Sequence, residues 1–418
     1  METGFHGNVP MLKSRSDASH VVFRRRELSP SSMRVNSFRT TIRSLQLDHS
    51  QSFWSLLSWF VGLTLLMVVP TFRLLYVKAT DDKPQHQLVF QPLVVSVGVW
   101  TSIVSFLFLR HAIRQHGLRG VLFLDSIAEE AVEVRKDYDI AIEQGATLLA
   151  KIFLPAFALF LVQKTWFFTH IKLQPLPFGF NSQVADLAVV IGASTFSWIF
   201  QTTTYLYTCV LFWTVCFLQE LKMKQFKESL GKRLSPELYY HQYVKILQGL
   251  QTTSRRFRQF LALTGAIIVF GALASMYAIV GARRTGFNIF MAGELLVLNM
   301  VNLTGIGLCL RSASRLAHFH RRIVKAACSM HALGTFSSAI QPATPCLRAD
   351  LSVDIVQRLE MLISTQDAWC RRAALVSFLS STNAGISVYG FVLDRFFVHT
   401  SIGALLTTTW FILGQSLG

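Results

Sequence analysis

The closing stretch of the chain carries polar side chains at a spacing that suits a pore. Ser401, Thr408 and Gln415 follow one another at intervals of seven residues in an otherwise apolar run. On a helix, each such interval turns the next side chain by only about 20°. A stripe of this kind on an apolar helix faces protein or water rather than lipid. It fits ordinary helix packing, and it also fits a helix that lines an aqueous pore.

Ionisable residues inside apolar stretches form a second group. Lys164, Asp186 and Glu294 lie within a turn or two of one predicted membrane surface. Such residues often mark a functional site, although snorkelling, or pairing with Arg283 or Arg284, also explains them. Aromatic residues share the same outer halves, where an apolar ligand pocket and an interfacial aromatic belt are both possible. The candidate pocket comprises Trp166, Asp186, Trp198, Tyr277 and Glu294.

No arrangement typical of catalysis is present. The sequence contains no phosphate-binding glycine loop, no His-Glu-x-x-His and no Gly-x-Ser-x-Gly. His318 and His320 are two residues apart, on different sides of a helix, and make a poor metal pair. The six cysteines form no Cys-x-x-Cys pair, which argues against a zinc site or a disulfide framework. We therefore expect no enzyme, no cofactor and no metal.

The composition indicates a polytopic membrane protein. Of the 418 residues, 51% are apolar and only 15% are charged, against about a quarter in a soluble domain, and the mean hydropathy is +0.41. The net charge of +17 suggests nucleic acid at first sight. However, the basic residues flank apolar stretches, where the positive-inside rule explains them. The expected surroundings are a lipid bilayer, most naturally the plasma membrane, and not nucleic acid.

Residues 1–51 are polar and rich in Ser and Arg, and we expect a disordered cytosolic tail. Residues 52–418 are expected to form one all-α domain with seven transmembrane helices. The fourth span would be roughly 50 Å long, so it must tilt or project beyond a hydrocarbon core of about 30 Å. The predicted spans are 52–77, 88–109, 146–168, 184–218, 261–282, 289–310 and 391–413.

The distribution of basic residues predicts the orientation. The tail and the segments 110–145, 218–260 and 311–372 hold 31 Lys and Arg, whereas the alternate segments hold five. The N-terminus is therefore expected in the cytosol and, with seven spans, the C-terminus outside. This topology is opposite to that of a G-protein-coupled receptor.

The inner segments 110–145, 219–260 and 311–390 are long and helix-like. Phe123–Glu143 carries seven acids, which either form a solvated face or pair with basic inner helices in a cytoplasmic anchor bundle. Spans four to six would then continue into that bundle. Residues 373–389 are too polar for a lipid-exposed span, so we expect a bundle helix leading directly into the last span. If they cross instead, there are eight crossings and the C-terminus is cytosolic.

One inner segment carries a family resemblance. It resembles the motif after the second span of a plant gustatory receptor-like membrane family, a plant domain of unknown function related to insect gustatory and odorant receptors. The architecture from about residue 52 onward is similar to theirs. The residues that carry the resemblance are Gly117-Leu-Arg-Gly-Val-Leu-Phe-Leu-Asp125, followed by Glu130, Val134-Arg135 and Tyr138.

The closing motif of the insect receptors has a counterpart here. Thr408 and Gln415 match its Thr and Gln at the same spacing, whereas Thr409 and Ser416 replace its aromatic residues. The resemblance implies a homotetrameric, ligand-gated cation channel whose last helix lines a central pore, with an unknown small-molecule ligand. It also implies that Leu405 and Leu406 form an apolar gate that closes by dewetting. The pore and gate residues are thus Ser401, Leu405, Leu406, Thr408 and Gln415.

Two other classes remain open. A transporter requires repeated halves and broken helices around a midplane site, and an odd number of spans without midplane charges argues against it. A non-conducting membrane scaffold or signalling protein on the same fold would act through its inner bundle and tail.

Overall fold

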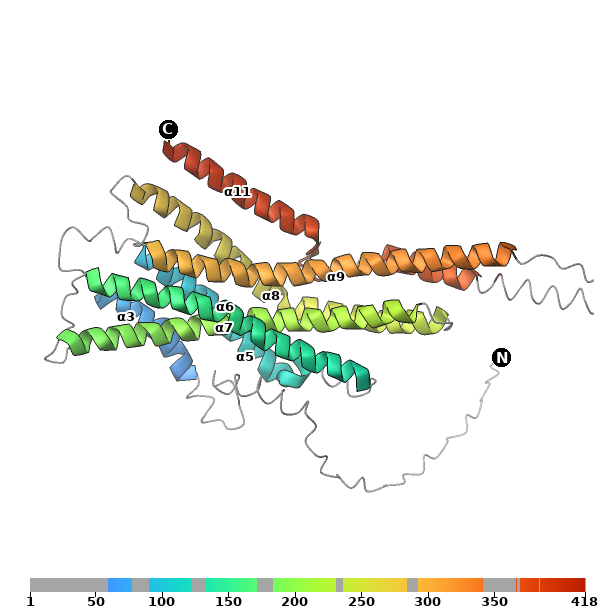
Figure 1. Cartoon of the computed structure of the whole chain (residues 1–418), viewed down its shortest axis with the longest axis horizontal. Helices are drawn as coiled ribbons and strands as arrows, with labels where there is room; N and C mark the ends of the chain where they lie inside the picture. Colours follow the sequence, from blue (N-terminus) through green and yellow to red (C-terminus); the bar gives the residue numbers. More distant parts are fainter. Residues whose placement is uncertain are drawn as a thin grey trace, which may run out of the picture.

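The computed structural model describes residues 59–76, 90–121, 132–170, 183–230, 236–283, 292–340, 366, 369–382 and 384–417. The predicted tail, residues 1–51, lies outside this part of the chain. The described residues are helical apart from two short strands (Figure 1). The first helix, residues 59–76, includes a π-helical turn before Pro70. The elements are η1 (Thr64–Val68), α3 (Val69–Tyr76), α5 (Gln91–Val121), α6 (Val132–His170), α7 (Gln183–Ser229), α8 (Pro236–Arg283), α9 (Gly293–Ile340), β1 (Ser387–Val388), β2 (Phe391–Val392) and α11 (Arg395–Leu417).

Three helices give the molecule its length. α7, α8 and α9 have 47, 48 and 48 residues, and at 1.5 Å per residue each is roughly 70 Å long. That is more than twice the thickness of a hydrocarbon core, about 30 Å. Each therefore runs from a predicted span into the adjoining inner segment without a break, as the sequence predicts for spans four to six.

Five helices of the described chain are long and apolar enough to cross a membrane. The apolar helix Trp59–Leu75, the described part of the first predicted span, is shorter. This is the architecture of a helical membrane protein. The qualifying stretches are Gln91–Gln115, Glu143–Phe167, Ala188–Ser229, Glu237–Val280 and Gly293–Ala332.

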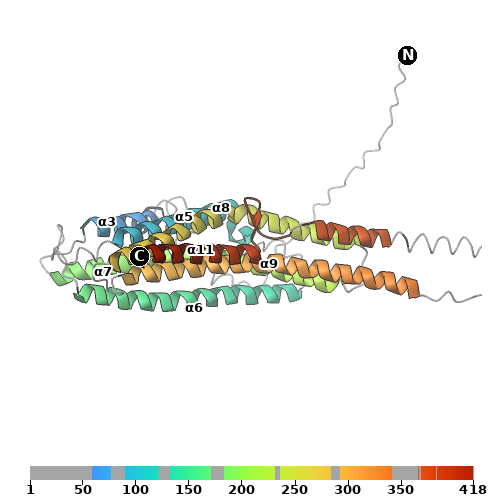
Figure 2. The same ribbon diagram turned by 90° about the horizontal axis from the view of Figure 1, so that it is seen from above.

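α7 forms the centre of the bundle. It packs against α3, α5, α6, α8 and α9, and its Tyr205, Tyr207 and Phe212 are among the largest fully buried side chains. Figure 2 shows α6 along one side of the molecule, with α3 and α5 on the opposite side. Most of the apolar stretch of α6 is exposed, whereas most of that of α7 is buried. α6 is thus a peripheral helix with a broad exposed apolar surface.

The contact between α7 and α9 depends on a glycine. Tyr205 Oη donates a hydrogen bond to the carbonyl oxygen of Asn302 at 2.7 Å, so the end of its side chain lies against α9. A Cβ atom on Gly305 would lie 2.5 Å from that hydroxyl oxygen and 2.7 Å from the ring. Only glycine at this position lets the two helices approach so closely.

We expect Gly305→Ala to lower the melting temperature of the detergent-solubilised protein. Because Tyr205 is fully buried and its hydroxyl is bonded to Asn302 O, overpacking should cost about 1–3 kcal/mol. Gly307→Ala is the matched control, since no atom lies within 4 Å of its added Cβ and the helix propensity of Ala favours the change. An equal effect of both substitutions would show that the contact does not require glycine.

The end of the chain corrects one prediction. The helix of the predicted 373–389 segment covers residues 369–381 and does not lead directly into the last span. Its last hydroxyls bond back to helix carbonyls: Ser381 and Thr382 both donate to Phe378 O, at 3.1 and 2.7 Å. Such bonds compete with helix propagation. The helix packs against α8 through Phe378, whose ring lies 4.9 Å from that of Tyr240.

A β-hairpin separates that helix from α11. Ser387 pairs with Val392 and Val388 with Phe391. The turn residues Tyr389 and Gly390 have φ values of 49° and 90°, the geometry of a two-residue hairpin turn. The last predicted span, 391–413, is therefore shifted: Phe391 and Val392 belong to a strand, and α11 begins at Arg395.

Asp394 fixes the start of α11. Its Oδ1 accepts a hydrogen bond from the backbone N–H of Phe397 at 2.9 Å, a normal N-cap. Its Oδ2 accepts a hydrogen bond from Arg321 of α9 at 3.0 Å. The backbone N–H of Ser387 donates to Ser254 Oγ of α8 at 3.1 Å. The hairpin thus attaches the base of α11 to both long helices.

Candidate functional site

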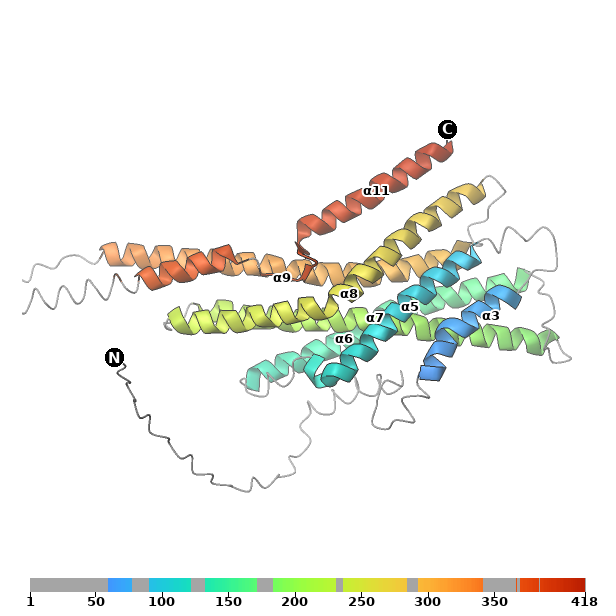
Figure 3. The ribbon, with the colours of Figure 1, turned by 180° about the vertical axis from the view of Figure 1, so that it is seen from behind.

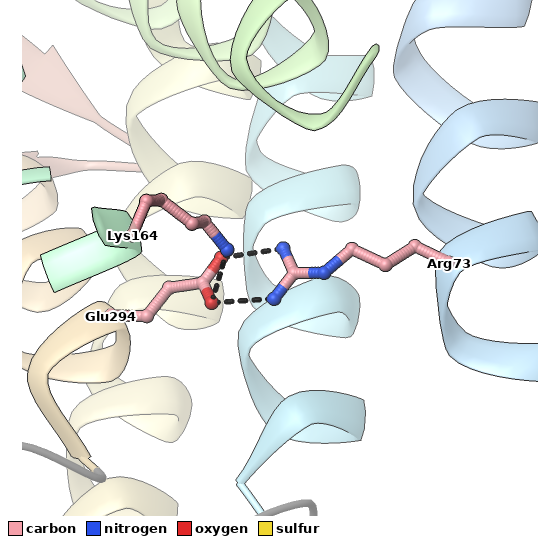
Figure 4. A network of polar contacts seen from close by, with 3 residues as sticks. All are labelled: Arg73, Lys164 and Glu294. Atoms are coloured by element: carbon pink, nitrogen blue, oxygen red, sulfur yellow. Dashed lines mark hydrogen bonds and ion pairs between the residues drawn. The ribbon is translucent and has the colours of Figure 1, made fainter. Parts of the chain in front are cut away.

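Three charged side chains from three helices meet where α3, α6 and α9 come together. The two terminal nitrogens of Arg73 donate to Glu294 Oε1 and Oε2 at 2.7 and 2.6 Å. Lys164 Nζ donates to Glu294 Oε2 at 2.8 Å. Figure 4 shows the carboxylate between the two cations. We call these three residues the charge cluster.

The charge cluster is almost closed to solvent. The side chains of Arg73, Lys164 and Glu294 are only 11%, 3% and 10% exposed. Glu294 lies in the first turn of α9, where the helix dipole favours a negative charge. A buried carboxylate that serves two cations and accepts three charge-assisted hydrogen bonds is a strong, specific cross-link. It ties together three helices that are distant in the sequence.

The predicted role of these residues therefore changes. Glu294 pairs with Arg73 and Lys164, whereas the side chains of Arg283 and Arg284 lie outside the described part. Arg73 of α3 instead reaches into the bundle and meets Glu294 in the first turn of α9. The sequence shows that Arg73, Lys164 and Glu294 are ionisable residues in apolar stretches, but it does not show that they pair with one another.

Aromatic rings continue from the charge cluster into α7. Lys164 Nζ lies 5.2 Å from the centroid of the Phe160 ring, within cation–π range. The Phe160 ring stacks on Trp198, with centroids 4.2 Å apart and planes 10° apart. Phe153 and Phe157 lie 6.1 and 6.2 Å from Trp198. A buried aromatic group thus adjoins a buried charge cluster.

The candidate ligand residues do not all gather at this place. Trp198 and Glu294 are both buried and are linked through Phe160 and Lys164. Trp166 of α6 is half-buried, whereas Tyr277 of α8 is 73% exposed and lies on the bundle surface. Asp186 belongs to α7, but its side chain lies outside the described part.

The candidate pore residues lie on α11, at the edge of the bundle (Figures 1 and 3). α11 packs against α8 and α9. The half-buried residues of α11 have helical spacing and form one narrow stripe: Val398, Ser401, Leu405, Thr409 and Ile412. The rest of its described surface is exposed, including Leu406 at 64% and Trp410 at 76%.

The residues of the predicted polar stripe do not share one environment in this packing. Ser401 lies in the half-buried stripe, whereas Thr408 is exposed and its hydroxyl donates to Ala404 O at 2.8 Å. The side chain of Gln415 lies outside the described part. The predicted gate is split as well, because Leu405 is half-buried and Leu406 is exposed. The two leucines therefore have different surroundings within one protomer.

Three ion pairs also tie the long helices to their neighbours. Arg315 binds Glu220 at 2.9 Å, Arg371 binds Glu237 at 2.6 Å, and Arg321 binds Asp394 at 3.0 Å. These pairs join α9 to α7, the 369–381 helix to α8, and α9 to the base of α11. The predicted pairing of the acidic segment Phe123–Glu143 concerns side chains that, apart from Glu143, lie outside the described part.

The fold has counterparts among solved structures. The insect olfactory receptor OR5 from Machilis hrabei in complex with eugenol matches with a TM-score of 0.57 and 13% identity, covering 91% of this chain and 99% of that one. A second structure of OR5 from Machilis hrabei matches with a TM-score of 0.55 and 13% identity, covering 91% of this chain and 98% of that one. At this identity the likeness concerns the fold.

Sequence comparison gives the family. No curated protein sequence matches the chain. The model of the family described as "Protein of unknown function (DUF3537)" matches residues 33–403, which is most of the chain and includes the Gly117–Asp125 motif. The predicted resemblance is confirmed: the chain belongs to the DUF3537 family of proteins of unknown function and has the fold of an insect olfactory receptor.

Proposed function

We propose that the protein is a subunit of a ligand-gated cation channel of the gustatory receptor-like type, in which four copies surround a pore lined by α11. The observation that carries this proposal is the surface of α11. This helix packs on its own protomer through one narrow stripe and exposes large side chains on its remaining described surface. Contacts with other copies around an axis would cover the exposed sides and leave one side for a pore.

The proposed topology has seven crossings with a cytosolic N-terminus. The strong bias of basic residues supports this orientation. It places the charge cluster at the outer surface, and the long inner ends of α7, α8 and α9 in the cytosol as an anchor for assembly. The proposed membrane is the plasma membrane.

The ligand region is proposed at the outer end of the bundle. OR5 is described in complex with eugenol, a small aromatic compound, which supports a small apolar ligand for the related fold. The aromatic group around Trp198, next to Glu294, suits such a ligand. Trp166 and Asp186 lie on α6 and α7, the two helices that carry this aromatic group, and remain candidate ligand contacts. Tyr277 remains one if a second copy of the protein covers it.

The mass of the purified full-length protein in nanodiscs tests this proposal without any ligand. The expected result is four copies of a 47.1 kDa chain per particle, after subtraction of lipid and scaffold. A tetramer brings four α11 helices to one axis. A strictly monomeric particle over a tenfold range of protein concentration would contradict a shared pore and favour a scaffold or a transporter.

A further inference from the structure

A basic cavity lies between α5 and α8, well away from the charge cluster. These two helices pack side by side (Figure 3) and enclose a cavity of about 660 Å³. Five arginines line it, together with His111. None of the described lining residues is Asp or Glu. The arginines are Arg110, Arg114, Arg255, Arg256 and Arg258.

The cavity lies at the inner edge of the membrane in the proposed topology. α5 starts at Gln91 at the outer surface, and Arg110 follows 19 residues later, roughly 28 Å along the helix. This is about the thickness of the hydrocarbon core. On α8, Arg258 immediately precedes the predicted span 261–282. Both helices therefore bring their arginines to the depth of the inner-leaflet headgroups.

Aromatic rings support two of these arginines. The guanidinium carbon of Arg110 lies 4.4 Å from the ring centroid of Trp59, and that of Arg258 lies 5.3 Å from Tyr389. Both distances are within cation–π range. A guanidinium stacked on a ring is held in a fixed orientation, and Arg258 is exposed, so its N–H groups can meet a planar, bidentate acceptor such as phosphate.

The opposite end of the cavity is apolar and open to lipid. Its lining includes Val104, Leu107, Phe108 and Leu263, of which Leu107 is 46% and Leu263 is 54% exposed. These residues lie on the membrane side of the arginines along both helices. A cavity that is strongly basic at the headgroup level and apolar toward the bilayer matches a whole anionic lipid better than a free phosphate ion.

We propose that this cavity binds an inner-leaflet phosphoinositide, with its phosphates on the arginines and an acyl chain along the apolar wall. Polybasic sites at the cytosolic surface attract such lipids, and five cations suit a headgroup with more than one phosphate. The hairpin turn takes part through Tyr389, which contacts Arg258. Lipid binding would therefore act next to the segment that holds the base of α11.

The test uses the purified full-length protein and two soluble probes. Dioctanoyl phosphatidylinositol bisphosphate carries both headgroup and chains, whereas inositol trisphosphate carries the phosphates alone. Binding is measured by titration calorimetry, and the rise in melting temperature with the lipid probe gives an independent readout. We expect the lipid probe to bind more tightly than inositol trisphosphate.

The variant Arg114→Gln/Arg255→Gln removes two exposed arginines of the cavity, so it should fold. We expect it to bind the lipid about tenfold or more weakly, because charge-assisted hydrogen bonds to phosphate are lost. The matched control Arg311→Gln/Lys325→Gln removes the same charge from exposed positions of α9 and should bind within about twofold of the natural protein, since such surface charges are screened.

Two results would overturn the proposal. If the cavity variant and the α9 control lose affinity for the lipid probe by the same factor, the attraction comes from the net charge of the protein and the cavity is not a specific lipid site. If inositol trisphosphate binds as tightly as the lipid, the apolar wall contributes nothing and the ligand is a soluble phosphate. Neither result depends on conductance or on the number of copies, so this proposal can fail while the channel proposal stands.

Discussion

Replacement of Glu294 by Gln is expected to destabilise the protein by about 3–5 kcal/mol, the usual cost of removing one partner from a buried ionic cluster. Arg73 would keep its charge in a site almost closed to solvent without the carboxylate that balances it, and the buried amine of Lys164 would lose its acceptor. The side-chain NH2 group of Gln would also face N–H donors of Arg73 and Lys164, which cannot accept a hydrogen bond from it. The measurements are the melting temperature and the yield of monodisperse protein in detergent.

Three further variants make this prediction specific. Lys164→Met should cost less than Glu294→Gln, because Arg73 and Glu294 remain as a neutral bidentate pair. Adding Lys164→Met to Glu294→Gln should restore part of the lost stability, since it removes a buried polar group that has lost its acceptor. Glu237→Gln breaks an exposed pair with Arg371 and should cost under about 1 kcal/mol. Equal losses at Glu294 and Glu237 would contradict a buried cross-link.

Leu406→Ser is expected to produce ionic conductance in the absence of ligand. In the proposed channel, Leu406 belongs to an apolar ring that stays dry when closed, and a hydroxyl at each of four positions favours water there. Loss of about 2 kcal/mol of apolar contact in the closed ring raises the open population about thirtyfold. The measurement is basal current in cells, normalised to surface expression.

The half-buried neighbour provides a comparison for this variant. Leu405 packs toward its own protomer, so Leu405→Ser should lower stability more than it raises basal current. Leu154→Ser, at a 62% exposed position of α6, should change neither. If Leu406→Ser reaches the cell surface normally but produces no basal current, Leu406 does not form the gate. If the natural protein also shows no current with any ligand tested, the channel proposal itself is contradicted.

Local sequence properties were enough for the membrane class and most of the helices. Hydropathy and length located α5 to α9, because an apolar run long enough to span a bilayer is a property of consecutive residues. The continuity of α7 was predictable for the same reason: the apolar run 184–218 exceeds the membrane thickness. The Gly117–Asp125 motif was also local, and it indicated the family that the match over residues 33–403 confirms.

The break in the helix before α11 was harder to predict from the sequence. Ser381, Thr382 and Gly390 were visible in the sequence, but a Tyr-Gly turn is a weak hairpin signal compared with Asn-Gly or Asp-Gly. The strand pairing of Ser387 with Val392 is supported by the contact of Ser387 with Ser254 on α8. A helix that continues into the last span was therefore the simpler prediction, and tertiary contacts decided against it.

The sequence by itself determined that this protein is a bundle of membrane helices, and where most of them lie. Only the tertiary structure decided which charges meet. Glu294 is 221 residues from Arg73 and 130 from Lys164, and Arg114 reaches the arginines of α8 only because α5 and α8 pack together. Hydropathy fixes which residues enter the membrane, whereas the pairing of charges depends on which helix faces touch, and no single segment encodes that.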